Sequence, residues 1–106
     1  MTDAVVILIT APSEESAETL ARALVEERLA ACVNLVPGVR SIYHWKGAIE
    51  DEREILCVVK TARDKVASLR ARVLAMHPYQ VPEILVLPVE ASHPAYLEWL
   101  LASVGA

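Results

Sequence analysis

The chain has 106 residues, of which 55% are hydrophobic and 23% charged, and its formal net charge at pH 7 is -4. This length fits one domain over residues 1–106, and the high apolar content excludes a disordered chain. The negative charge and the lack of any cluster of basic residues argue against nucleic acid and against an anionic membrane as partners.

The N-terminal segment predicts where the protein resides. The start of the chain, MTDAVVILITAP, has no basic region, and its apolar run of about eight residues is too short for a secretory signal. No apolar run in the sequence approaches the length of about 18 residues that spans a bilayer. These features predict a cytoplasmic protein with no membrane segment.

The first two predicted elements are a strand and a helix. Residues 4–10 form a β-branched apolar run, which is typical of a buried strand. Ser13 stands where a helix N-cap belongs, and the apolar residues after it recur at helical spacing as far as about Leu29. Because the N3 position holds Ser16 rather than Glu, an incomplete capping box is predicted.

A hairpin is predicted in the middle of the chain. Residues 32–36 are extended, and Pro37-Gly38 interrupts them before residues 41–45 resume a strand. Residues 46–52 turn the chain, and residues 53–61 return as the antiparallel partner.

The register of this hairpin separates the two cysteines. If the turn lies near residues 47–50, Cys57 falls opposite Val39–Arg40, and Cys32 lies several residues away along the ladder. A disulfide between them is therefore not expected. Their apolar neighbours predict two buried, reduced thiols.

The remaining elements are a helix, a strand and a terminal helix. Asp64 is placed to cap the helix, which ends at His77 because a residue that precedes proline avoids helical dihedrals. Residues 82–90 predict a fourth strand, with an edge or a bulge at its prolines. Residues 93–104 predict a short helix at the end of the chain.

The order of elements defines the fold class. A βαββαβ order with a short C-terminal helix is the α+β, ferredoxin-like split βαβ arrangement, in which one antiparallel sheet carries both long helices on a single face. A sheet with one solvated face should alternate apolar and polar residues, but residues 4–9, 55–59 and 84–89 are apolar almost throughout. The second face is therefore predicted to be buried against copies of the same chain. The alternative is that the terminal helix covers it.

Several stretches together resemble the CutA family. They are TAPSEESA (10–17), ALVEERLAACVNLVPG (23–38), SIYHWKG (41–47), a strand that ends in Lys60-Thr61, and HPYQVPEI (77–84). The resemblance runs from residue 5 to about residue 101. It implies a ferredoxin-like subunit in a tightly packed, PII-like homotrimer whose sheets join edge to edge. It also implies a link to tolerance of copper and other divalent ions, with no established reaction.

The resemblance also bears on the copper site. Family members with an assigned copper site have a Cys at the position of Ile9 and a second His at the position of Met76. Of that set this chain keeps only His77. The three-ligand site therefore does not carry over as a whole.

His77 is nevertheless the best single metal candidate. Its imidazole suits copper or zinc, and the thioether of Met76 beside it suits Cu(I). A tight site needs three or four ligands, and the others would come from Glu83, Cys32 or a neighbouring chain. The alternative for His77 is a structural role, in which its charge complements the C-terminal dipole of the helix. The alternative for Cys32 is an inert, buried thiol.

A ligand cleft is the second candidate site. Its predicted residues are Tyr43, Trp45, Lys60, Tyr79 and Glu83. Aromatic side chains beside convergent polar groups are typical of a pocket. One alternative is a structural ion pair between Lys60 and Glu83 at a subunit junction. Another is that Tyr43 and Trp45 anchor an interface.

Three functions remain open from the sequence. The first is a trimeric, non-enzymatic protein of divalent-cation tolerance, which requires no cofactor and weakly binds copper or another divalent cation. The second is a PII-like sensor of a small anionic ligand, for which Lys60 and Arg40 would supply positive charge. The third is a scaffold that anchors another protein through its outer helices. No enzyme is predicted, because the sequence has no GxGxxG, Walker, HExxH or GxSxG motif.

Overall fold

A computed structural model describes residues 1–105 of the chain. The strands are β1 (Ala4–Ala11), β2 (Cys32–Trp45), β3 (Ala48–Ala62) and β4 (Leu85–Pro88). The helices are α1 (Glu14–Glu26), the short 3-10 helix η1 (Arg63–Lys65), α2 (Val66–Met76) and α3 (Pro94–Gly105). This order confirms the predicted α+β, ferredoxin-like fold class.

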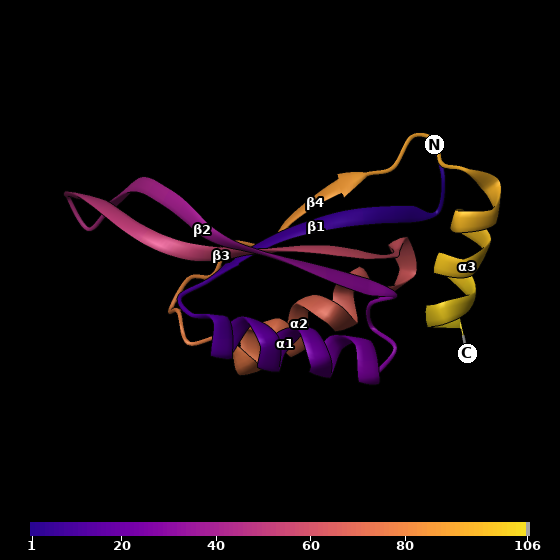
Figure 1. The fold of residues 1–106 in the computed structure, drawn as a ribbon, viewed down its shortest axis with the longest axis horizontal. Coiled ribbons are helices and arrows are strands. Elements are labelled where there is room, and N and C mark those ends of the chain that lie inside the picture. Colours follow the sequence, from indigo (N-terminus) through magenta and orange to yellow (C-terminus); the bar gives the residue numbers. More distant parts are fainter. Residues whose placement is uncertain (106) are drawn as a thin grey trace.

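One antiparallel sheet forms the centre of the molecule. Its four strands lie in the order β2-β3-β1-β4, so β2 and β4 are its edges. Helices α1 and α2 lie side by side under one face of the sheet, and α3 stands at one end, next to the N-terminus (Figure 1). At the other end, β2 and β3 extend past the body of the molecule as a long hairpin (Figure 1).

The core fills the space between the sheet and the two long helices. Alternate residues of β1, namely Val5, Ile7 and Ile9, are buried there together with Leu24 of α1 and Leu69 of α2. The helical spacing of the partners is what the sequence pattern predicted. The period of two along β1 comes from strand geometry, since the residues between the buried ones are apolar as well.

The start of α1 differs from its prediction. The Oγ of Ser13 accepts the backbone N–H of Ser16 at 3.1 Å, and the Oγ of Ser16 accepts the backbone N–H of Ser13 at 3.3 Å. The capping box is therefore complete, since a serine hydroxyl reaches the N-cap backbone as a glutamate would. The helix ends at Glu26, before the predicted Leu29, because Arg28 adopts a left-handed φ of 57°.

The β2–β3 hairpin contains a bulge and a tight turn. Val36 pairs with Leu56 but Val39 pairs with Glu54, so β2 carries one extra residue at the predicted break, where Gly38 has a φ of 72°. The turn is only two residues long, and both Lys46 and Gly47 have positive φ, as a type I′ turn requires.

This turn lies closer to the N-terminus than the predicted one, which shifts the register. Cys57 consequently pairs with Leu35, and its predicted position opposite Val39–Arg40 is wrong. Cys32 pairs with Lys60, and both cysteines are free, as expected. Cys57 is buried as predicted, but Cys32 is only partly buried, so its predicted burial is wrong.

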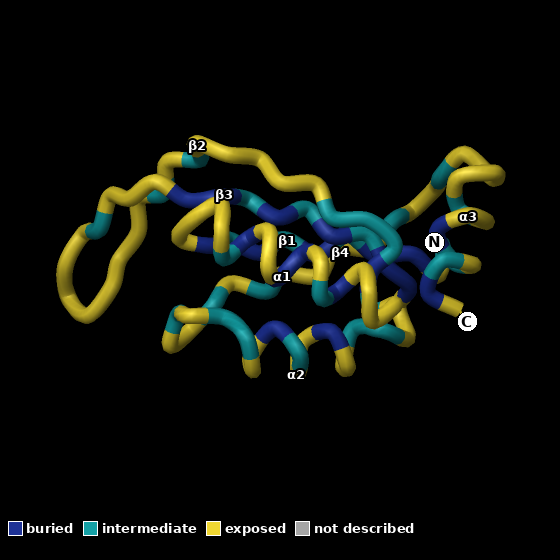
Figure 2. The backbone as a smooth tube through the Cα atoms, turned by 60° about the horizontal axis from the view of Figure 1, so that its bottom comes forward, coloured by how far each residue is buried: buried dark blue, intermediate teal, exposed yellow. Residues whose placement is uncertain are grey.

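The bulge divides the hairpin into two halves. The inner half, residues 32–36 with 55–62, belongs to the body of the sheet, and the outer half, residues 39–54, projects from it. Figure 2 shows the outer half as mostly exposed, whereas β1 and the inner part of β3 are buried or intermediate.

Two elements of the second half are shorter or differently capped than predicted. Strand β4 covers only Leu85–Pro88, shorter than the predicted residues 82–90, although the backbone N–H of Val89 still donates to the carbonyl of Ala4 at 3.2 Å. Asp64 does not cap α2: it lies within η1, and the N-cap position of α2 is Lys65, with no side-chain hydrogen bond. The predicted end of α2 is confirmed, since His77 has an extended ψ of 135°.

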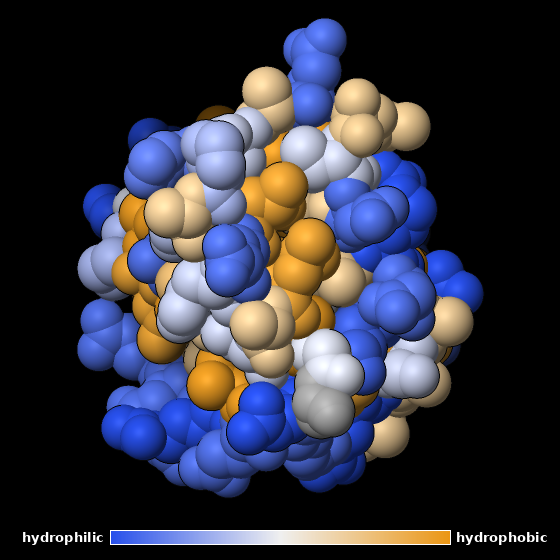
Figure 3. Space-filling view, turned by 90° about the vertical axis from the view of Figure 1, so that its right-hand side faces the viewer, coloured by the Kyte–Doolittle hydropathy of each residue, from blue (hydrophilic) through white to orange (hydrophobic). Residues whose placement is uncertain are grey.

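The second face of the sheet is apolar and open. Leu85 and Leu87 of β4 are 54% and 46% exposed, and Val36 of the other edge strand is 42% exposed. Helix α3 packs on the end of the sheet through Leu100 and Val104 and leaves these side chains uncovered. The end of the molecule at which α3 lies also presents hydrophobic side chains among hydrophilic ones (Figure 3).

Candidate functional site

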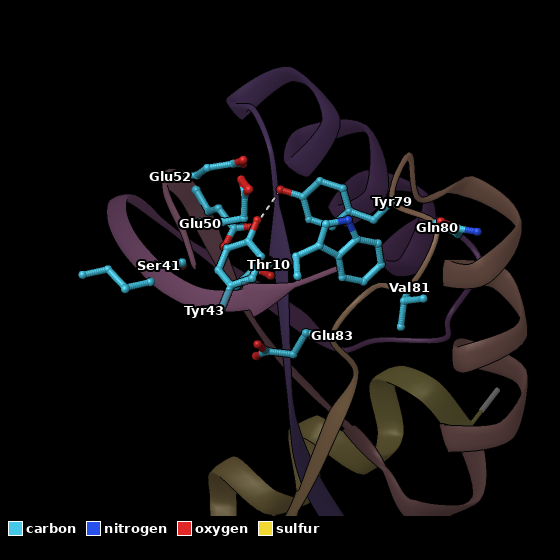
Figure 4. Close-up of a pocket in the computed structure, with 12 residues that line it drawn as sticks. Thr10, Ser41, Tyr43, Glu50, Glu52, Tyr79, Gln80, Val81 and Glu83 are labelled. Atoms are coloured by element: carbon cyan, nitrogen blue, oxygen red, sulfur yellow. Dashed lines mark hydrogen bonds between the residues drawn. The ribbon is translucent and has the colours of Figure 1, made fainter. Parts of the chain in front are cut away.

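A cavity of about 620 Å³ opens between the outer half of the hairpin and the segment 77–84. It is lined by Thr10, Ser41, Ile42, Tyr43, Trp45, Glu50, Glu52, Glu54, Tyr79, Gln80, Val81 and Glu83. In Figure 4 the side chains of Tyr43, Glu50 and Glu52 approach it from the hairpin, and those of Tyr79, Val81 and Glu83 approach it from the segment that leads to β4.

The two sides of the cavity are joined by one strong hydrogen bond. The hydroxyl of Tyr79 donates to Oε2 of Glu54 at 2.6 Å (dashed in Figure 4), and Glu54 is only 5% exposed. The pKa of Tyr79 is raised well above its ordinary value, first by burial and then by this hydrogen bond to Glu54. Tyr79 therefore stays a neutral donor at any physiological pH.

His77 holds the segment in place. Its Nε2 lies 2.7 Å from the carbonyl oxygen of Thr10, and its Nδ1 accepts the backbone N–H of Tyr79 at 3.1 Å. These partners make Nδ1 an acceptor and place a proton on Nε2, which donates to the carbonyl. The rings of His77 and Tyr79 also lie 4.8 Å apart. His77 thus acts as a positioning residue for Tyr79, beyond closing α2.

The cavity is strongly negative. It contains the carboxylates of Glu50, Glu52, Glu54 and Glu83, and its lining includes no Lys, Arg or His. Burial raises the pKa of Glu83, and the nearby charge of Glu54 raises it further. Desolvation and then the same cluster of carboxylates raise the pKa of Tyr43. Four uncompensated carboxylates favour a cationic guest and disfavour an anionic one.

The predicted metal ligands are not brought together. Both ring nitrogens of His77 are already hydrogen-bonded. Glu83, on the same segment, lines the cavity, whereas His77 does not. Cys32 pairs with Lys60, and Lys60 pairs with Val6 of β1. Val6 lies four residues before Thr10, which lines the cavity, so at about 3.3 Å per residue Cys32 is displaced by about 13 Å along the strands from the cavity.

The positions of Ile9 and Met76, and the thiol of Cys57, also provide no metal site within residues 1–105. Ile9 is buried in the core, and Met76 packs against that core. Burial raises the pKa of the Cys57 thiol to about 11, so it is protonated at neutral pH. Within residues 1–105, no group of three or more His, Cys, Asp or Glu side chains is arranged to hold a metal ion.

Four of the five predicted cleft residues line the cavity, and Lys60 does not. Tyr43, Trp45, Tyr79 and Glu83 converge there. Lys60 instead donates to Oδ1 of Asn34 near Cys32, and it makes no ion pair with Glu83. Arg40 is paired with Asp51 at 2.6 Å on the exposed hairpin. The two basic residues expected to attract an anion are therefore absent from the cavity.

The glutamates of the hairpin are the functional candidates that the sequence prediction missed. Glu50, Glu52 and Glu54 recur with a period of two, which places them on one face of β3. Tyr43 lies directly opposite Glu50 in the ladder. The spacing alone indicates this acidic row, but the prediction assigns the segment to a turn followed by an apolar strand.

The fold and the site together define a ferredoxin-like α+β protein with an acidic, aromatic-lined cavity at the base of a projecting hairpin. The chain belongs to the CutA1 divalent ion tolerance protein family, which it matches over residues 5–103. The resemblance seen in the sequence is thereby confirmed. The family is not one of known enzymes.

Individual relatives are similar over almost the whole chain. The divalent-cation tolerance protein CutA of Thermus thermophilus is 54% identical over 100 residues, which is 94% of this chain and 97% of that protein. The protein CutA of Mus musculus is 50% identical over 92 residues, 87% of this chain but only 52% of the mouse protein.

Solved structures of relatives have the same fold. The divalent cation tolerance protein (Cut A1) from Thermus thermophilus has a TM-score of 0.93 at 53% identity, with 96% of this chain and 99% of that one covered. CutA from Xylella fastidiosa has a TM-score of 0.95 at 41% identity, with 97% and 99% covered.

The names of the relatives give more than one cellular location. One solved relative, from Archaeoglobus fulgidus, is described as periplasmic, and a relative from Arabidopsis thaliana as chloroplastic. None of the helices within residues 1–105 has the length and apolar character needed to cross a membrane. A cytoplasmic location stays a prediction.

Proposed function

We propose that the chain works as a homotrimer in divalent-cation tolerance, the role for which its relatives are named. The observation that carries the assembly is the uncovered apolar face of the sheet. Leu85 and Leu87 at one edge and Val36 at the other are all close to half exposed. Burial of each such side chain is worth about 1.5–3 kcal/mol in full, so association has a substantial driving force.

The sheet edges support an edge-to-edge arrangement. Strands β2 and β4 are both edge strands, and each offers unpaired backbone groups to another chain. Both edges belong to the same subunit, so β4 of one chain can join β2 of the next. A rotation that closes after three copies gives the trimer.

Metal binding in this proposal depends on assembly. No single chain presents a complete ligand set within its described residues. A weakly bound copper or other divalent ion would use His77 only after displacing one of its two present partners, with further ligands such as Glu83, or Cys32 from a neighbouring subunit. No metal is required as a cofactor.

Sedimentation velocity tests the assembly with a matched pair of variants. The wild type is expected at three times the mass of one chain. Leu87→Glu, on the apolar face, is expected to lower that mass, whereas Leu74→Glu, at a 56% exposed position on α2, is expected to leave it unchanged. A folded wild type that sediments as a single chain would refute the trimer.

Calorimetry tests the metal. Titration with Cu(II), Cu(I) and Zn(II) is expected to give weak binding that His77→Ala reduces and His93→Ala, a control just before α3, does not. Equal heats for the wild type and His77→Ala would remove His77 as a ligand.

A second candidate function is the sensing of a small ligand in the cavity. The specific observation in its favour is the convergence of Tyr43, Trp45, Tyr79 and Glu83 around a space of about 620 Å³, which is in the usual size range of ligand sites. The scaffold alternative has a weaker basis, namely the exposed Tyr96 and Trp99 on α3.

A further inference from the structure

We propose that the cavity at the base of the hairpin binds an organic cation, a diamine or polyamine whose ammonium groups lie between the carboxylates and the aromatic rings. This inference gives a ligand class to the small-ligand alternative. It does not depend on copper binding, but it requires that the cavity stay accessible when the adjacent apolar face is buried in the proposed trimer.

The first observation is a nearly buried carboxylate with spare capacity. Glu54 is 5% exposed, and its Oε2 accepts from Tyr79, but its Oε1 has no hydrogen-bond partner within residues 1–105. Every fully buried side-chain oxygen among the described residues has a hydrogen-bond partner. Since Oε1 has none, it is not fully buried and borders the open cavity. An ammonium group supplies the donors that this oxygen lacks.

The second observation is the set of aromatic rings around the carboxylates. Tyr43, Trp45 and Tyr79 all line the cavity. An ammonium group is attracted to the face of such a ring within about 6 Å of its centroid. The ring of Trp45 already attracts one, since Nζ of the neighbouring Lys46 lies 5.5 Å from its centroid.

The lining favours an organic cation over a bare metal ion. No set of three or more potential ligands in residues 1–105 has the geometry of a metal site. The apolar side chains of Ile42 and Val81 are part of the wall, and they can contact methylene groups but cannot coordinate a metal. Four carboxylates exceed the charge of a monoamine, so a molecule with two or more ammonium groups balances them better.

The binding experiment uses the full chain with Trp99→Phe, so that Trp45 is the only tryptophan and reports on the cavity. Putrescine and spermidine are titrated at low ionic strength, with the uncharged 1,4-butanediol and the anion glutarate as controls. A saturable change in Trp45 emission is expected with the amines alone. No change with either amine, or an equal change with butanediol, would overturn the proposal.

A pair of charge-matched variants locates the site. In the same background, Glu83→Gln is expected to raise the Kd for spermidine about tenfold, which corresponds to about 1.4 kcal/mol. Glu98→Gln, which removes the same charge from α3, is expected to leave the Kd unchanged. Equal Kd values for the two variants would show a general charge effect and overturn the proposal, and so would an equal response to MgCl2 at matched ionic strength.

One further outcome identifies a different occupant. If the amines have no effect and Glu83→Gln instead lowers the sedimenting mass, a basic side chain of a neighbouring subunit fills the cavity, and the proposal is wrong. The mass of the wild type and its copper titration are measured independently. Failure of amine binding is therefore distinguishable from failure of the proposed trimer or metal site.

Discussion

The two halves of the β2–β3 hairpin share two strands and one ladder but differ in almost every other property. In the inner half, residues 55–61 of β3 alternate buried and partly buried positions and pack on α1 and α2, whereas residues 34–36 of β2 are exposed. The outer half is mostly exposed, apart from Glu54, and carries most of the carboxylates and two of the aromatic rings of the cavity. Backbone pairing is therefore the main support of the outer half, and its side chains are available for binding.

A matched pair of truncations on one strand should show this difference most strongly. Ile55, in the inner half of β3, is 7% exposed, and Ile49, near the turn, is 62% exposed. Ile55→Ala is expected to lower the free energy of unfolding by about 2–5 kcal/mol, because it leaves a cavity in the core. Ile49→Ala is expected to change it by less than about 0.5 kcal/mol. Urea unfolding followed by circular dichroism measures both, and equal losses would contradict the division into halves.

The hydrogen bond between Tyr79 and Glu54 ties the outer half to the rest of the chain. Tyr79→Phe removes the donor and leaves the nearly buried Glu54 without its partner, which is expected to cost about 1–3 kcal/mol of stability. Tyr96→Phe, on the exposed surface of α3, serves as the control and is expected to have almost no effect. An equal loss of stability in both variants would show that the hydrogen bond between Tyr79 and Glu54 contributes little to the free energy of unfolding.

The smallest expected effect concerns Glu83 and pH. Because its pKa is raised in the folded state, the folded protein holds this proton more tightly than the unfolded chain does, and stability falls as the pH rises through the range above 4.5. Glu83→Gln is therefore expected to raise the melting temperature slightly at neutral pH, by the equivalent of less than about 1 kcal/mol after solvent screening. The gain should vanish well below pH 4.5, where the carboxylate is protonated in both states. A gain that is independent of pH would contradict this cause.

The existence of the strand in the inner half of the hairpin was predictable from sequence, because strand and helix patterns depend on residues that are close together in the chain. The continuous apolar run of residues 55–59 indicates a buried strand, and the helical spacing of Leu20 and Leu24 specifies one apolar helix face; the structure packs the two together. The apolar second face was predictable for the same reason, since too many residues of β4 and β1 were apolar for one covered side.

The site was predictable only in part, because it depends on register. Tyr43, Trp45, Tyr79 and Glu83 were expected to converge, and they do. Lys60 was misplaced because its distance along the ladder follows from the exact position of the turn, and a two-residue turn at Lys46-Gly47 is shorter than the predicted one. The hydrogen-bond partners of His77 were equally hidden, since the carbonyl of Thr10 is 67 residues away in the chain.

The bulge next to Gly38 has an effect well beyond its own position. Before the bulge, even-numbered residues of β2 lie on the same side of the ladder as even-numbered residues of β3. After the bulge, odd-numbered residues of β2 lie on that side, as in the pair Tyr43 and Glu50. One additional residue thus inverts the parity of the distal strand and turns both of its aromatic rings toward the acidic row. Without the bulge, Ile42 and His44 would face the acidic row in place of Tyr43 and Trp45. The set of side chains that line the cavity is therefore determined by a bulge whose own residues are not part of the lining.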